Sequence, residues 1–251
     1  MAWLNCEVVV SGAAGGIGRA ITLAMVARGG RVHALDRDAD GLVRLVAEGQ
    51  GQVVPYAVDL GDTPQVDAVL TRLLAILPGR CDVLVNNAGI SHVVPFAETS
   101  DTQLDQLWRI NVLAAMRITR ALLPPLRVGA SPAIVNIASE LALVGQPGYV
   151  AYSASKGAVL AWSRALAIEL ATDRIRVNTV CPGPIDTPML DAEFVIADNP
   201  AAARAGEIAT VPLGRLGRPT DIAAMVAFLA GPDANFITGA TFAVDGGKTA
   251  R

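Results

Sequence analysis

Short apolar, strand-like runs alternate with helical patterns from one end of this chain to the other. The strand-like runs are expected at 7–11, 31–36, 52–58, 82–86, 133–138, 175–181 and 241–244. Helices are expected at 17–28, 39–48, 64–77, 102–123, 151–172 and 220–230. Strands that are joined through helices lie parallel in one sheet, because each crossover returns the chain to the same edge. We therefore predict an α/β fold, a doubly wound, seven-stranded parallel sheet with helices on both faces.

Composition supports a sheet that is buried on both sides. Hydrophobic residues make up 52% of the 251 residues but aromatic residues only 4%, so the excess lies in small and aliphatic side chains. No linker or repeat interrupts the pattern, and we predict a single domain over 1–251. The prolines Pro124 and Pro125 are expected to end the long fourth helix. The segment of about 184–219 has no regular pattern except for a short helix near 201–205, and we interpret it as a lid or binding loop.

Charge and cysteine content exclude several functional classes. The formal net charge is −3 and no Lys/Arg cluster occurs, which argues against nucleic-acid binding. Cys6, Cys81 and Cys181 are far apart, so we expect free buried thiols in a reducing cytoplasm and no metal site. Residues 1–5 have no basic segment of a signal peptide. No uncharged apolar run reaches about 18 residues, so we expect no membrane span.

A glycine-rich turn joins the first strand to the first helix. In the segment 11–18, glycines at 12, 15, 16 and 18 permit a tight turn and a close approach of backbone to a pyrophosphate. The following helix N-terminus presents free N–H groups to an anion. Asp36 ends the second strand, where a carboxylate accepts hydrogen bonds from adenosine ribose hydroxyls and repels the 2′-phosphate of NADP. NAD is therefore favoured over NADP, although Arg37 beside Asp36 weakens this preference.

Tyr152 and Lys156 lie four residues apart in a predicted helix and so share one face. A free tyrosine has a pKa of about 10, and a neighbouring ammonium favours the phenolate and lowers that pKa. Such a pair can make tyrosine an acid or base near neutral pH. Taken alone, the pair is also compatible with a solvated helix face.

Several further motifs agree with these in order and spacing. They are Asp59-Leu60, Asn87-Ala88-Gly89, Asn111, Ser139, Pro182-Gly183 through Ile185 and Thr187, and Asp245-Gly246-Gly247. With these motifs the whole chain resembles the short-chain dehydrogenase/reductase family, in its ordinary form of about 250 residues. Ser11 stands where that family usually has Thr and keeps the hydroxyl. The resemblance implies a Rossmann-type fold and hydride transfer to or from a nicotinamide cofactor.

The resemblance also implies a role for each catalytic residue. Tyr152 would exchange a proton with the substrate oxygen, and Lys156 would lower the phenol pKa and bind the nicotinamide ribose. Ser139 would hold the substrate carbonyl or hydroxyl. Asn111 would hold a water of a proton relay, or else be a packed polar side chain with a backbone partner. The positions implied for cofactor binding are Ser11, Gly12, Gly16, Ile17, Gly18, Asp36, Asp59, Leu60, Asn87, Ala88, Gly89, Tyr152, Lys156, Pro182, Gly183, Ile185 and Thr187.

The substrate side is less constrained by the sequence. The resemblance places it near Ser139, Glu140, Leu141, Tyr149, His92 and Met189. Apolar residues dominate this region, which favours a small or medium-sized, largely apolar alcohol or ketone. Glu140 would bind a substrate hydroxyl or amine, or else point to solvent or cap a turn.

The function predicted from these features is NAD-dependent transfer of hydride between a secondary alcohol and its ketone. An alternative of the same fold is a 3-oxoacyl-[acyl-carrier-protein] reductase, and a non-enzymatic alternative is a catalytically silent cofactor-binding regulator. Related enoyl reductases have a longer gap between Tyr and Lys, so the spacing favours carbonyl chemistry. The helices at 102–123 and 157–171 are apolar on nearly all sides, and we therefore predict a homo-oligomer, with a tetramer favoured.

Overall fold

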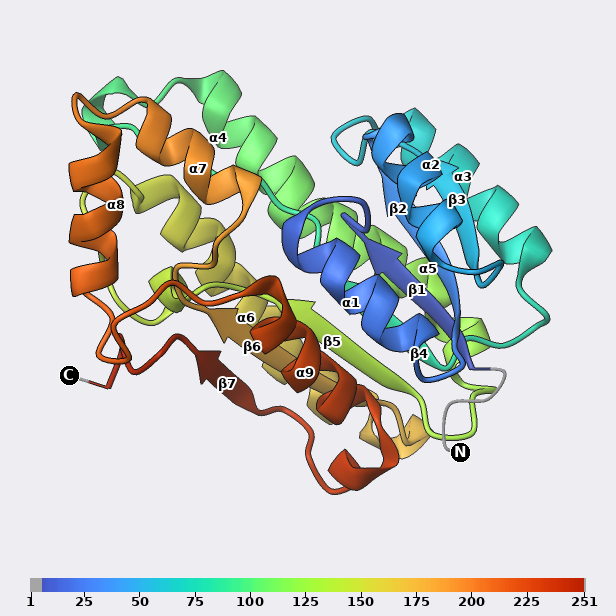
Figure 1. Cartoon of the computed structure of the whole chain (residues 1–251). Coiled ribbons are helices and arrows are strands. Elements are labelled where there is room, and N and C mark those ends of the chain that lie inside the picture. The colour runs from blue at the N-terminus through green and yellow to red at the C-terminus, as the bar shows by residue number, and fades with distance from the viewer. Residues whose placement is uncertain (1–5, 251) are drawn as a thin grey trace.

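The computed structural model describes residues 6–250 and contains one seven-stranded parallel sheet (Figure 1). The strand order is β3-β2-β1-β4-β5-β6-β7, which confirms the predicted doubly wound fold. The N-terminal residues 1–5, on which the absence of a signal peptide was judged, lie outside the described part. Among residues 6–250, no helix combines the length and apolar character needed to cross a membrane. The strands are β1 (Glu7–Ser11), β2 (Arg31–Asp36), β3 (Val53–Ala57), β4 (Val83–Asn86), β5 (Ala133–Ile137), β6 (Arg176–Pro182) and β7 (Thr241–Val244).

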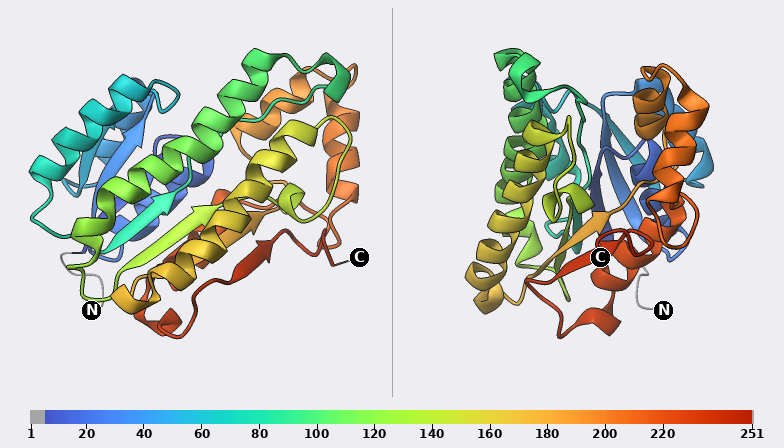
Figure 2. Two further views of the ribbon diagram at one scale, coloured as in Figure 1. Left: turned by 180° about the vertical axis from the view of Figure 1, so that it is seen from behind. Right: turned by 90° about the vertical axis from the view of Figure 1, so that its left-hand side faces the viewer.

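Helices cover both faces of this sheet, as the two views of Figure 2 make plain. The α-helices are α1 (Gly16–Val26), α2 (Ala39–Glu48), α3 (Thr63–Ile76), α4 (Asp101–Trp108), α5 (Ala115–Leu126), α6 (Val150–Glu169), α7 (Pro188–Val195), α8 (Pro200–Ala209) and α9 (Pro219–Ala230). A π-helical turn, η2 (Arg109–Ala114), joins α4 to α5. Short 3-10 turns are η1 (Phe96–Glu98), η3 (Glu140–Ala142), η4 (Ala171–Asp173) and η5 (Pro232–Ala234).

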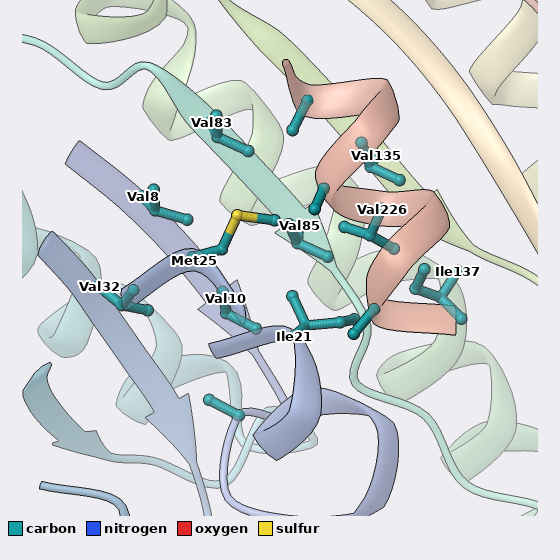
Figure 3. Close-up of a cluster of buried hydrophobic side chains, with 14 of the residues drawn as sticks. Val8, Val10, Ile21, Met25, Val32, Val83, Val85, Val135, Ile137 and Val226 are labelled. Atoms are coloured by element: carbon teal, nitrogen blue, oxygen red, sulfur yellow. The ribbon is translucent and has the colours of Figure 1, made fainter. Parts of the chain in front are cut away.

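Alternate strand residues form two separate apolar layers, because successive side chains point to opposite faces. Val8 and Val10 of β1 pack with α1, α2 and α9 in the layer that Figure 3 shows. Val9, between them, packs in the other layer with α3, α5 and α6. All five residues of β1 are buried. A strand buried on both faces is what the near-continuous apolar runs of the sequence require.

The predicted long helix at 102–123 differs from the structure in two ways. It is interrupted by η2, and it continues through Pro124 and Pro125 to Leu126. The two prolines remove N–H donors only in the final turn, where the backbone still closes with Arg127 N–H donating to Leu123 O at 3.0 Å. The prolines therefore end the helix slightly later than predicted.

The segment expected to be irregular, about 184–219, contains two helices. The short helix predicted near 201–205 is part of α8, whereas α7 was not predicted. Both begin with a capping side chain followed by proline: Thr187 accepts a hydrogen bond from Leu190 N, and Asn199 from Ala202 N. In Figures 1 and 2, α7 and α8 (orange) lie side by side beyond the carboxyl ends of the strands.

Candidate active site

Residues that follow β1 to β6 line one cavity of about 480 Å³. This is where open α/β sheets bind ligands, and the volume is within the usual range for a small-molecule site. Most of the residues predicted from the sequence line it. They are Gly12, Gly16, Ile17, Asp36, Asp59, Leu60, Asn87, Ala88, Gly89, Ser139, Glu140, Leu141, Tyr149, Tyr152, Lys156, Pro182, Gly183, Ile185, Thr187 and Met189. Four predicted residues are not part of its wall: Ser11, Gly18, Asn111 and His92.

The glycine-rich turn has the shape that a phosphate group requires. Gly12 adopts φ +63°, and a Cβ there would lie 2.8 Å from Ala88 Cα. A Cβ at Gly18 would lie 1.8 Å from the carbonyl oxygen of Gly12, so Gly18 packs the helix against the turn from behind. The N-cap residue Gly15 provides no side-chain hydrogen bond, and the first turn of α1 has no acidic residue. Its N–H groups are therefore free for an anion, and the site fits a dinucleotide pyrophosphate.

Ser11 and Asn87 fix this turn to the neighbouring strand end. The Ser11 hydroxyl accepts hydrogen bonds from the N–H groups of Asn87 and Ala88 at 3.1 and 3.2 Å. The Asn87 amide donates to the carbonyl oxygens of Ser11 and Gly12 at 3.1 and 3.0 Å. Ser11 therefore supports the wall of the cavity from behind.

Asp36 lies at the end of β2 with its carboxylate held by the backbone. One oxygen accepts from Ala14 N–H at 2.9 Å and the other from Asp38 N–H at 2.9 Å. Both Asp36 and the exposed Arg37 line the cavity. The carboxylate is thus oriented at the glycine-rich turn, beside a side chain of opposite charge.

Ser139, Tyr152 and Lys156 meet at the carboxyl end of β5. Ser139 begins η3, and its hydroxyl accepts a hydrogen bond from Leu141 N–H at 3.1 Å. The Ser139 hydroxyl is close enough to the Tyr152 phenol to lower its pKa. Lys156, one helical turn further along α6, is 4% exposed, and its ammonium donates to the carbonyl oxygen of Ile137 at 3.0 Å. The three side chains predicted to act together are therefore adjacent.

Lys156 was expected to lower the pKa of the Tyr152 phenol, but it is not among the groups that shift this pKa in the structure. Burial raises the pKa of Tyr152 to about 12, and the nearby Ser139 hydroxyl only partly opposes that rise. The Lys156 ammonium points to the Ile137 carbonyl and lies 5.9 Å from the centre of the Tyr152 ring. Burial also lowers the pKa of Lys156 to about 8. Desolvation therefore disfavours the charged form of both groups, and this outweighs their proximity.

Asn111 stands behind this group, in the π-helical turn η2. Its side-chain oxygen accepts from Ile90 N–H at 2.8 Å, and its amide donates to Ile90 O and to the Ser155 hydroxyl, both at 3.0 Å. A Cβ at Gly89 would lie 3.1 Å from the Lys156 ammonium and 3.3 Å from the Asn111 oxygen. Asn111 is therefore a packed polar side chain with a backbone partner, which is one of the two roles expected for it. It also lies next to Lys156. Single π-helical turns inside α-helices are frequent at functional sites.

Glu140, next to Ser139, neither points to solvent nor caps a turn with its side chain. It is 4% exposed, and its Oε1 accepts from the Lys248 ammonium at 2.9 Å. Lys248 also donates to Glu207 of α8 at 2.5 Å. Burial raises the pKa of Glu140, and the hydrogen bond from Lys248 opposes that rise. The C-terminal segment, which ends beside α8 in Figure 1, therefore joins the loop after β5 to the lid.

The other predicted substrate residues occupy different positions. The Tyr149 hydroxyl donates to Glu193 Oε2 at 2.7 Å, and burial, with this bond, raises the Tyr149 pKa. Leu141 and Met189 line the cavity, the latter from α7. His92 is not part of the cavity wall, and its buried Nε2 has no hydrogen-bond partner among the described residues.

Several residues of the cavity wall were not anticipated. They include Ser91, Glu193 and Glu207, the last two of which lie on the lid helices α7 and α8. The Thr187-Pro188 and Asn199-Pro200 pairs, which are typical starts of helices, were the available signal for these two helices. Lys248 is another unanticipated residue, since its carboxylate partners are distant in the sequence.

The fold and this cavity define a dinucleotide-binding oxidoreductase class with a Ser, Tyr and Lys group at its centre. A family model described as enoyl-(acyl carrier protein) reductase matches residues 12–249. The chain is 35% identical to the 3-oxoacyl-[acyl-carrier-protein] reductase FabG of Thermotoga maritima, over 95% of this chain and 96% of that protein. It is 42% identical to cyclopentanol dehydrogenase of Comamonas sp., over 75% of this chain and 72% of that protein.

A solved structure gives the same result for the fold. The 3-ketoacyl-(acyl-carrier-protein) reductase from Brucella melitensis, complexed with NADH, superposes with a TM-score of 0.89. It is 32% identical, and the match covers 98% of this chain and 99% of that one. The chain belongs to the short-chain dehydrogenase/reductase family of oxidoreductases.

Proposed function

We propose that this protein is an NAD-dependent alcohol dehydrogenase or ketoreductase that interconverts a secondary alcohol and its ketone. The observation that carries the proposal is the group of Ser139, Tyr152 and Lys156 in the same cavity wall as Asp36 and the glycine-rich turn. Relatives named for 3-ketoacyl and cyclopentanol substrates support chemistry on a carbinol carbon.

The residues present fit a nicotinamide dinucleotide. The free N–H groups at the start of α1 would hold the pyrophosphate, and Asp36 would bind the adenosine ribose. Asp59, Leu60 and the strand end at 87–89 would line the adenosine side. Lys156, with the segment from Pro182 to Thr187, would hold the nicotinamide side. The bound cofactor supplies the hydride acceptor for oxidation and the hydride donor for reduction.

The proton chemistry belongs to the side chains of this chain. Ser139 would hold the substrate oxygen next to Tyr152 with its hydroxyl, since both side chains line the cavity. In oxidation the phenolate would take the hydroxyl proton as the carbon loses hydride, and in reduction the phenol would return it. Asn111 and Lys156 are adjacent behind Gly89, in a position suited to passing protons away from Tyr152.

The test is the Tyr152→Phe variant, which keeps the ring and removes only the proton donor. We expect turnover with NAD and a panel of secondary alcohols, diols, sugars and hydroxysteroids to be abolished, while titration with NADH still gives binding. The control is Thr71→Val, which removes an exposed hydroxyl on α3 that donates only to Asp67 O. A near-normal rate in Tyr152→Phe would refute the assignment.

A second candidate is reduction of 3-oxoacyl thioesters. It is favoured by the identity and coverage of the FabG relative and of the Brucella structure. Asp36 argues against the NADPH that this reaction usually uses. Comparing NADH with NADPH on an acetoacetyl thioester and on a simple ketone separates the two functions. Because of the Tyr–Lys spacing, we expect no reduction of an enoyl thioester.

We also propose that the protein forms a homo-oligomer through α4, α5 and α6. Large apolar side chains on these helices and on η2 are exposed, including Trp108 at 44%, Met116 at 42% and Ile168 at 79%. An exposed apolar face of this kind is typical of an interface. Sedimentation of the dilute protein as a folded monomer would contradict this proposal.

A further inference from the structure

The carboxylate of Glu140 is only half satisfied. Its Oε1 accepts from the Lys248 ammonium at 2.9 Å. Its Oε2 is buried and has no hydrogen-bond partner among residues 6–250. Glu140 lines the cavity directly after Ser139, the residue expected to hold the reacting oxygen. A buried acceptor without a partner costs about 1–3 kcal/mol, so a ligand group that donates to Oε2 would recover that energy.

The charge around Glu140 selects the kind of donor. Lys248 lies between Glu140 and Glu207, so Oε1 of Glu140 is already paired with a cation, which it shares with Glu207. A substrate ammonium on Oε2 would share the Glu140 carboxylate with the Lys248 ammonium, and like charges held on one carboxylate repel. A hydroxyl donates one hydrogen bond without adding charge. The free oxygen therefore favours a neutral O–H donor.

The rest of the wall limits the skeleton that carries this hydroxyl. Glu193 of α7 and Glu207 of α8 line the same cavity and disfavour an anionic substrate. The wall also contains apolar residues, among them Val93, Leu190 and Phe194. A neutral molecule with an apolar skeleton and few oxygens matches this surface.

We propose that Glu140 is a specificity-determining residue whose Oε2 binds a second hydroxyl of the substrate, so that the preferred substrates are diols or their hydroxyketones. This inference rests on the proposed alcohol–ketone activity. Ser139 and Tyr152 act on the first hydroxyl: its oxygen gives the proton to Tyr152, its carbon gives up hydride to NAD, the oxidant, and the carbonyl of the ketone forms. The second hydroxyl is only bound, and its bonds are unchanged.

The experiment compares matched pairs of alcohols with NAD as the oxidant. The pairs are cyclohexanol against cyclohexane-1,2-diol and cyclohexane-1,3-diol, and octan-2-ol against octane-2,3-diol. A hydrogen bond to a charged group contributes about 1.5–3 kcal/mol, so we expect kcat/KM at least ~10-fold higher for one diol of each set. An equal kcat/KM for diols and mono-alcohols in the wild-type enzyme would overturn the proposal without any variant.

Two variants distinguish a substrate-binding role of Glu140 from a purely structural role. Glu140→Leu removes the acceptor, and we expect it to abolish the diol preference, measured as the ratio of kcat/KM for each diol to kcat/KM for the matched mono-alcohol. Glu207→Gln is the matched control, since it removes the other carboxylate on Lys248 and leaves Glu140 Oε2 intact. It should keep the preference. Equal losses on both substrate types in Glu140→Leu would mean a structural role and would refute the proposal.

The same assays distinguish a failure of the proposed role of Glu140 from a failure of the proposed alcohol–ketone activity. Faster oxidation of 2-aminocyclohexanol than of cyclohexane-1,2-diol would overturn the neutral donor. Oxidation of mono-alcohols with no gain for any diol would refute the role of Glu140 but leave the proposed function intact. Absence of NAD-linked oxidation of every alcohol, and of NADH-linked reduction of the ketones, would refute the proposed function itself.

Discussion

Lys156 is a buried ammonium whose presence should reduce the stability of the folded protein. Burial lowers its pKa from 10.5 to about 8. One pKa unit corresponds to about 1.4 kcal/mol, so burying the charged form costs about 3 kcal/mol. Substitution would also remove the hydrogen bond from Lys156 to the Ile137 carbonyl. This loss offsets about 1 kcal/mol of the stability gained by removing the buried charge. We predict that Lys156→Met raises the free energy of unfolding at pH 7 by about 2 kcal/mol.

The pH dependence gives this prediction a specific signature. Below pH 8 Lys156 is charged in the folded and the unfolded protein, so the full cost of burial is present. From pH 8 to about 10.5 the folded protein has released its proton while the unfolded chain still holds it, so wild-type stability rises with pH relative to the variant. The advantage of Lys156→Met should therefore shrink above pH 8 and reverse by roughly 1 kcal/mol near pH 10.5.

The assay is urea unfolding, followed by circular dichroism at pH 7, 8, 9 and 10 and at one protein concentration. Lys248→Met is the matched control. Although burial lowers the pKa of Lys248, its hydrogen bonds to Glu207 and Glu140 raise it overall. Removing this cation should destabilise the protein at pH 7, and because its folded pKa lies above 10.5 the difference should persist through pH 10. A pH-independent difference for Lys156→Met, or a less stable variant at pH 7, would refute the reasoning.

Further predictions concern the cofactor side and the phenol. Asp36→Ser should raise the NADP-to-NAD ratio of kcat/KM at least ~10-fold, whereas Asp38→Ser, which keeps a capping side chain on α2, should leave it unchanged. Gly18→Ala should destabilise the protein by several kcal/mol in thermal unfolding, because its Cβ would clash with the Gly12 carbonyl; Gly15→Ala, with no atom within 4 Å, should not. Because burial raises the pKa of Tyr152 to about 12, kcat/KM for alcohol oxidation should rise between about pH 7 and 10, and a flat profile would contradict this.

The parts of the site that lie at strand ends could be predicted from the sequence. Asp36, Asn87, Ser139 and Pro182 each follow or end an apolar run, and parallel strands bring their carboxyl ends to one edge. The strand assignments needed only changes of a residue or so at their ends. The apolar runs suffice for this, because a strand that is buried on both faces is apolar along nearly its whole length.

The substrate half could not be predicted to the same degree. Glu140, Glu207 and Lys248 meet only after the loop beyond β5, the lid and the C-terminal segment have folded together. No local sequence pattern predicts such a contact. Helical spacing likewise gives the proximity of Lys156 to Tyr152 but not the desolvation of both groups, which raises the pKa of Tyr152 and lowers that of Lys156.

The residues of proton transfer and the residues expected to recognise the substrate thus lie on parts of the protein that differ in rigidity. Tyr152 and Lys156 lie on α6, packed against strands whose residues are fully buried. In the lid, Arg204 of α8 forms exposed ion pairs with Asp191 of α7 and with Asp186, which precedes α7, and such pairs contribute about 0–1 kcal/mol each. Because Glu207 belongs to this weakly held part, movement of α8 would act on Glu140 through Lys248 and leave Tyr152 in place. Substitutions in the lid should therefore change which alcohol is accepted before they change the proton transfer.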